Sequence, residues 1–143
     1  IGFSERFTTR NFNLDTFELT SSTTRDAKWV GQFFAYGGSG ADRSTAIYFA
    51  MPPGMRLGRH TDTAEETQYV LSGTGDLLLD EGSKPVRAGD VFVLPEGTAH
   101  DLRNTGRDDL RIIAFFSAPQ VEQHWSEEVW EPGDLTVTGT PNR

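Results

Sequence analysis

Short runs of apolar and β-branched residues alternate along this chain with clusters of Gly, Pro, Asp and Asn. Such runs, bounded by turn-forming residues, are typical of β-strands. Their spacing of about ten residues favours a sandwich or a barrel. We therefore predict an all-β fold whose strands cover residues 17–20, 28–36, 44–51, 66–72, 76–80, 91–94, 99–104 and 110–117.

Glycine-rich segments separate several of these strands, as turns require. They lie at residues 37–40 and 73–75, and a third turn at 87–90 leads into a further strand. Residues 120–130 differ, because Val121, Trp125 and Val129 lie four positions apart. That spacing predicts a short C-terminal helical segment with one apolar stripe.

The length of 143 residues is enough for one core and too short for two ordinary domains. We find no internal repeat and no linker, so we expect a single domain over residues 1–143. Its barrel core covers about 28–118, N-terminal strands lie within 1–27, and an extension follows at 119–143, with residues 139–143 as a frayed tail.

The net charge of −8, from 13 basic and 21 acidic residues, argues against nucleic acid or an anionic membrane as the main partner. The absence of cysteine excludes disulfides, thiolate metal sites and thiol nucleophiles. No apolar run reaches the roughly 20 residues of a membrane span, and no signal-peptide pattern opens the chain. We expect a soluble, cytoplasmic protein.

Candidate chemistry begins at His60, in a segment that continues through Asp62 and Glu66 to Gln68. In an extended strand these four residues share a parity and point to one face. Nitrogen and oxygen donors on one face suit a divalent metal ion. Taken alone, however, a histidine near acids on a polar strand is more often a solvated surface.

A second segment contains Gly89, Pro95, Gly97, His100 and Asn104. With these residues the chain resembles the cupin superfamily, whose second motif G-x5-P-x-G-x2-H-x3-N matches at every fixed position. The family's first motif, G-x5-H-x-H-x3–4-E-x6-G, matches at four of its five fixed positions, which are Gly54, His60, Glu66 and Gly73. At the remaining position Asp62 replaces the second histidine.

The resemblance implies a double-stranded β-helix, or jelly-roll barrel, with one divalent metal ion inside it. Carried over by position, the metal ligands are His60, Asp62, Glu66 and His100. Three arrangements stay open: Asp62 coordinates with the other three, Asp62 stands back and leaves a two-His, one-carboxylate set, or the metal is lost and the carboxylates Glu66 and Asp62 do acid–base chemistry. The identity of the metal, Fe, Mn or Zn, is open as well.

Five further residues on predicted strands are candidates for the surroundings of the site. Gln68 has the parity of Glu66 and is a candidate hydrogen-bond partner of a metal ligand. The four others are aromatic and are candidates for the wall of a substrate pocket, although aromatic strand residues are more often plain core: Tyr48, Phe34, Phe92 and Phe116.

The resemblance implies a metal-dependent enzyme for a small-molecule substrate, and the two-His, one-carboxylate set favours a non-haem iron dioxygenase. One alternative is a Mn- or Zn-dependent isomerase, lyase or decarboxylase, with Glu66 or an unligated Asp62 as proton acceptor. Another is a cupin that binds a small ligand without catalysis, because the fold alone does not choose a function. The resemblance and the exposed strand edges of such barrels also favour a homodimer.

Overall fold

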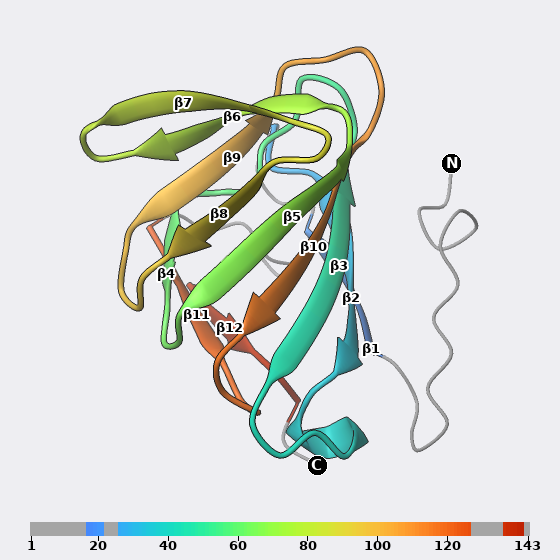
Figure 1. Cartoon of the computed structure of the whole chain (residues 1–143), viewed down its shortest axis with the longest axis vertical. Helices are drawn as coiled ribbons and strands as arrows, with labels where there is room; N and C mark the ends of the chain where they lie inside the picture. The colour runs from blue at the N-terminus through green and yellow to red at the C-terminus, as the bar shows by residue number, and fades with distance from the viewer. Residues whose placement is uncertain (1–16, 22–25, 127–135, 142–143) are drawn as a thin grey trace.

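The structure is a computed structural model, and it describes residues 17–21, 26–126 and 136–141. Within these residues the fold is all-β and consists of two six-stranded antiparallel sheets (Figure 1). Besides the strands, the described part contains one 3-10 turn at Gly37–Ser39. None of the described segments forms a helix of the length and hydropathy needed to cross a membrane.

The first sheet has the strand order β1-β2-β3-β10-β5-β8 and runs across the front of Figure 1. Its strands are β1 (Phe17–Ser21), β2 (Trp29–Ala35), β3 (Thr45–Met51), β10 (Leu110–Phe116), β5 (Glu66–Ser72) and β8 (Val91–Leu94). The second sheet has the order β12-β11-β4-β9-β6-β7. Its strands are β12 (Val137–Gly139), β11 (Glu122–Trp125), β4 (His60–Asp62), β9 (His100–Asn104), β6 (Thr74–Leu79) and β7 (Gly82–Arg87).

The core lies between the two sheets, because each strand alternates its side chains between two faces. Strand β10 buries Leu110, Ile112, Ala114 and Phe116, and its intervening residues are more exposed. These residues belong to one apolar cluster that also takes side chains from β6, β9 and β11 of the other sheet. The predicted all-β jelly roll is confirmed, and its interior is filled by alternate residues from both sheets.

The predicted C-terminal helical segment is wrong where the structure describes it. Residues 122–125 form β11, which pairs with β4 on one side and β12 on the other. Val121 and Trp125 are buried, whereas Glu122 and His124 are exposed. A separation of four residues fits one turn of a helix, but it also fits two strand repeats, and burial of every second residue identifies the strand. Val129 lies outside the described residues.

The glycine that ends the first motif has a steric reason to be glycine. Gly73 has φ +89°, and a Cβ atom there would lie 2.8 Å from the carbonyl oxygen of Asp109. Any other residue would be strained in this conformation and would also press on the neighbouring backbone. The turn between β5 and β6 therefore depends on this glycine.

Asn104, the last residue of the second motif, secures the loop that follows β9. Its amide nitrogen donates to the carbonyls of Met51 and Asp108, and its amide oxygen accepts from the backbone of Gly106. Each of these contacts satisfies a polar group at a site where Asn104 itself is buried. The Asn104 side chain thus holds the loop in place through these three hydrogen bonds.

Candidate metal centre

Two neighbouring strands of the second sheet bring the candidate histidines together. His60 on β4 lies directly opposite His100 on β9, and their ring centroids are 4.2 Å apart. Asp62 follows His60 by two residues and therefore shares its face. Glu66 comes from β5 of the other sheet and points into the same interior. All four side chains are buried, each being 1–5% exposed.

The donor atoms of these residues lie close to one another. The Nε2 atom of His100 is 3.5 Å from Oδ2 of Asp62 and 3.4 Å from Oε1 of Glu66. The Nε2 atom of His60 is 3.7 Å from the same Asp62 oxygen. One ligand atom each from His60, Asp62 and His100 lie within 4.8 Å of one another, which is a spacing that one metal ion can bridge. Glu66 lies beside this group of three.

Backbone carbonyls fix the orientation of both imidazole rings. The Nδ1 atom of His60 is 2.8 Å from the carbonyl oxygen of Gly58, and Nδ1 of His100 is 2.8 Å from that of Thr98. A carbonyl oxygen only accepts, so each Nδ1 must carry the hydrogen. Both Nε2 atoms are then directed into the interior, as in a metal-ligating histidine whose other nitrogen is hydrogen-bonded.

Burial and mutual charge shift the proton affinities of the metal-free site. Burial raises the pKa of Asp62 to about 8, and the neighbouring Glu66 charge adds to the rise. For His100, burial acts to lower the pKa, but the hydrogen bond and charge of Glu66, with the charge of Asp62, raise it to about 9. Burial and the nearby His100 hold the pKa of His60 well below its usual value. Protons therefore occupy part of this donor set when no cation is bound.

The donor set fits a divalent metal ion. The observation that supports this fit is a group of buried polar atoms without hydrogen-bond partners. Both carboxylate oxygens of Asp62, Oε1 of Glu66 and Nε2 of His100 are buried without a hydrogen-bond partner of normal geometry. Buried polar atoms are nearly always satisfied, and leaving one unpaired costs about 1–3 kcal/mol. A cation held by His60, Asp62 and His100 would supply a partner for the Asp62 carboxylate and for Nε2 of His100. Imidazole and carboxylate donors suit Fe, Mn or Zn.

An apolar pocket opens beside this cluster. Its empty space is about 370 Å³, including the part open to solvent. Four polar side chains line it, and three of these are the candidate ligands His60, Asp62 and Glu66. The rest of the wall is apolar: Trp29, Ile47, Phe49, Leu57, Phe116 and Trp125. The candidate ligands therefore form one side of a pocket whose remaining wall consists mostly of aromatic and aliphatic side chains.

The predicted pocket residues separate into two groups. Phe116 lines the pocket, and Phe92 packs against the main core. Gln68 is fully buried, and neither its amide oxygen nor its amide nitrogen has a partner, although it does not line the described pocket. Tyr48 and Phe34 lie elsewhere, in a small cluster on the other face of the first sheet.

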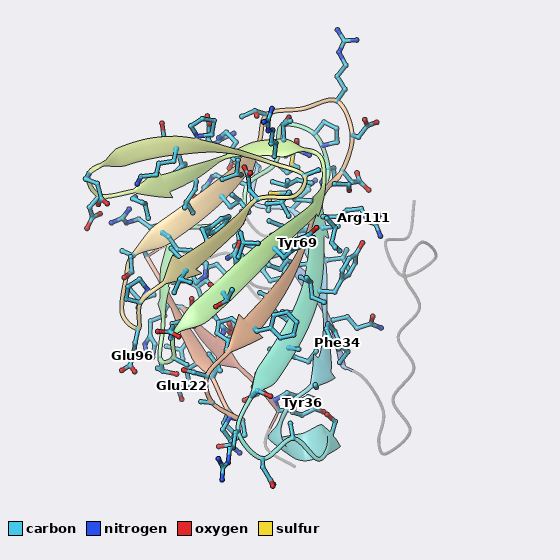
Figure 2. The ribbon with its side chains drawn as sticks, viewed as in Figure 1. Phe34, Tyr36, Tyr69, Glu96, Arg111 and Glu122 are labelled. Carbon is cyan, nitrogen blue, oxygen red and sulfur yellow. The ribbon has the colours of Figure 1, made fainter. Side chains whose placement is uncertain are left out.

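The alternation of β3 explains that placement, because its neighbours Ile47 and Phe49 face the pocket and Tyr48 faces away. The Tyr48 hydroxyl accepts a hydrogen bond from Arg111 on the outer face. Figure 2 labels Phe34 and Arg111 on the strands of this sheet. The parity of β3 therefore excludes Tyr48 from the pocket wall.

Sequence reasoning missed most of the pocket wall, including two residues beside the proposed ligands, Gln123 and Trp125. Both belong to β11 and line the pocket, and the Trp125 ring lies 4.4 Å from the His60 ring. In the paired strands Gln123 lies opposite Asp62, and Trp125 lies opposite His60. The sequence gives little signal for this strand, because the three residues between Val121 and Trp125 are all polar.

Comparison with known proteins agrees with the geometry. A family model described as a cupin domain matches residues 47–116, which include all four candidate ligands. The chain belongs to the cupin superfamily. Among curated proteins, this cupin is 39% identical over 66 residues to an oxalate-binding protein of Thermotoga maritima. That match covers 45% of the chain and 54% of the relative, so the chain spans about half the length of this relative.

Solved structures share the fold at lower identity. The polyketide cyclase RemF of Streptomyces resistomycificus matches with a TM-score of 0.59 and 22% identity, over 77% of this cupin and 79% of that chain. A variant of salicylate 1,2-dioxygenase from Pseudoaminobacter salicylatoxidans, in complex with gentisate, matches with a TM-score of 0.56 and 16% identity. That match covers 64% of this cupin and 25% of the dioxygenase. At such identities the likeness shows the fold alone.

Proposed function

We propose that this cupin is a metal-dependent enzyme that acts on a small molecule in the pocket beside His60. The observation that carries the proposal is the set of buried, unpaired donor atoms at the wall of an apolar pocket. Asp62 and His100, together with His60, are the ligands of one divalent ion, and Glu66 is either a fourth ligand or a proton acceptor beside it.

The reaction that we propose first is a dioxygenase reaction of non-haem Fe(II). The three donors of His60, Asp62 and His100 form a two-His, one-carboxylate set, which leaves coordination positions open. When bound, Fe(II) supplies activation of oxygen and polarisation of a substrate oxygen. The chain itself supplies the wall: Trp29, Phe49 and Phe116 hold an apolar or aromatic substrate and exclude water. A gentisate-bound relative of the same fold supports a ring-shaped substrate.

A redox-neutral lyase, isomerase or cyclase reaction is the second candidate, and the pair of carboxylates favours it. Asp62 and Glu66 are both buried at the same interior site. One carboxylate can bind the ion while the other accepts or returns a proton, as general acid–base catalysis requires. The polyketide cyclase with the same fold supports this class of reaction.

Metal analysis tests the proposal directly. The wild-type protein, purified without a metal-affinity step, is compared with His100→Ala and with His124→Ala, whose histidine is exposed and outside the site. We expect about one Fe, Mn or Zn per chain in wild type and in His124→Ala, and loss of most of it in His100→Ala. No bound metal, and no gain in melting temperature with any of the three ions, would overturn the proposal.

Oxygen uptake then distinguishes the two reactions. The iron-loaded protein is supplied with hydroxylated aromatic acids and diketones in an oxygen-electrode cell. Consumption of oxygen that His100→Ala lacks supports the dioxygenase. Product formation without oxygen consumption supports the redox-neutral reaction. Tight binding of these compounds without turnover would overturn both and leave a ligand-binding barrel.

A further inference from the structure

Three strands of the second sheet place three polar side chains in one row beside the metal cluster. In the antiparallel register Gln123 of β11 lies opposite Asp62 of β4 on one side and opposite Thr138 of β12 on the other. Residues that pair across neighbouring strands point to the same face of a sheet. The row Thr138–Gln123–Asp62 therefore runs from the edge of the sheet to a candidate metal ligand.

The hydrogen bonds along this row have a defined direction. The indole nitrogen of Trp125 donates to the hydroxyl oxygen of Thr138 at 2.8 Å. An indole N–H can only donate, so the Thr138 hydroxyl is the acceptor there and keeps its own hydrogen for another partner. That partner is the amide oxygen of Gln123, 3.3 Å away.

This direction settles which end of the Gln123 amide faces the pocket. Because the amide oxygen accepts from Thr138, the amide nitrogen, with its two hydrogens, is directed away from Thr138. Gln123 lines the pocket together with Asp62 and lies opposite it in the paired strands. A hydroxyl on β12 thus turns the donor end of the Gln123 amide, and not its acceptor end, toward the side of the pocket where Asp62 lies.

The same hydroxyl also fixes the ring that covers His60. With its N–H held by Thr138, the Trp125 ring lies 4.4 Å from the His60 ring at an interplanar angle of 34°. The ring also stacks on Trp29 at 6.1 Å, which holds it from the other sheet. The orientations of one imidazole and one carboxylate ligand are therefore linked to a single threonine.

We propose that Thr138, Gln123 and Trp125 form a positioning unit for the metal centre, in which Thr138 orients the Gln123 amide toward Asp62 and holds the Trp125 ring against His60. The inference rests on the proposed metal-dependent function. None of the three residues is a metal ligand or a catalytic residue. Hydrogen-bond partners of metal ligands typically change metal affinity by about 10–100-fold when they are removed.

Cobalt binding to the full chain tests this unit without a substrate. Co²⁺ is titrated into metal-free protein, and its dissociation constant and visible absorption spectrum are recorded. We expect Thr138→Val and Gln123→Leu each to raise the dissociation constant roughly ten-fold and to shift the visible bands, because the orientation of Asp62 is lost. Thr138→Ser keeps the hydroxyl and should bind within about three-fold of wild type.

Two further variants separate positioning from a general structural effect. Thr140 also uses its hydroxyl in a hydrogen bond, which it accepts from the backbone of Val121, so Thr140→Val is the matched control and should leave Co²⁺ binding unchanged. The double variant Thr138→Val/Gln123→Leu should bind about as weakly as Thr138→Val alone, since Thr138 acts on Asp62 through Gln123.

The outcomes distinguish this inference from the proposed function. If Thr138→Val lowers the stability of the metal-free protein but leaves the Co²⁺ constant and spectrum as in wild type, Thr138 has only a structural role and the inference is overturned. Fully additive losses in the double variant would also overturn it. If wild type itself takes up no Co²⁺, the proposed function fails first, and the inference fails with it.

Discussion

The buried carboxyl of Asp62 makes a sharp prediction about the metal-free protein. Replacing it, in Asp62→Asn, should make the metal-free protein more stable at alkaline pH, although it removes a proposed ligand. The reason is that the native state keeps the Asp62 proton up to a pKa of about 8, whereas an unfolded aspartate loses it near pH 4. The folded protein therefore becomes less stable as pH rises through this range.

The magnitude follows from proton counting. Each proton that the native state holds and the unfolded chain lacks lowers the free energy of unfolding by about 1.4 kcal/mol per pH unit. Between pH 7 and 8 wild type holds most of the Asp62 proton and nearly all of the His100 proton, whose pKa is about 9. We therefore expect wild-type stability to fall by about 2 kcal/mol per unit. In Asp62→Asn only His100 contributes, and the fall is about 1 kcal/mol per unit.

Urea unfolding from pH 6.5 to 8.5 in the presence of a chelator, followed by tryptophan fluorescence, measures these slopes. Asp80→Asn is the control, because Asp80 is an exposed carboxylate, and it should keep the wild-type slope. Adding metal should reverse the order, with wild type gaining more stability than Asp62→Asn. Equal slopes in wild type and Asp62→Asn would show that Asp62 is ionised and satisfied in the folded protein, and would refute the reasoning.

Three other predictions follow from the described contacts. Binding of Zn²⁺ at pH 7 should release about two protons, from His100 and Asp62, as calorimetry in buffers of different ionisation enthalpy will show; release of none would contradict the assigned protonation. Asn104→Ala should lower the free energy of unfolding by roughly 2–3 kcal/mol in urea, because the three hydrogen bonds of this buried side chain are lost. Gly73→Ala should lower the melting temperature more than Gly89→Ala, since both have positive φ but only Gly73 would meet backbone atoms; equal losses would contradict the steric argument.

Much of the fold could be predicted from alternation alone. The bounds predicted for β5 and β8 are those observed, and six other strands were placed within about two residues at most ends. Strand β7 was missed because it lies at the edge of its sheet and buries only Val86, so it has no apolar pattern. Strand β11 was misassigned because the spacing of Val121 and Trp125 fits both periods.

The site was predictable only in part, for a related reason. The parity of His60 and Asp62 follows from one strand, and it correctly places both side chains on one face. Their meeting with His100 depends on the pairing of β4 with β9, which only the family resemblance supplied. Gln123 and Trp125 reach the pocket through the pairing of β4 with β11, a long-range contact that no local pattern encodes.

The proposed metal ligands and part of the pocket wall come from different stretches of the chain. Every candidate ligand falls within residues 47–116, the part that the family model matches, whereas β11 and β12 follow it. Similarity to other cupins can therefore support a metal centre in a chain without specifying the substrate of that chain. Substitutions at Gln123 and Trp125, which line the pocket, can change the substrate range without replacing any ligand, although the positioning role proposed above couples them to metal affinity. Randomising these strands, with residues 60–100 untouched, is accordingly the direct way to search for new activities on this barrel.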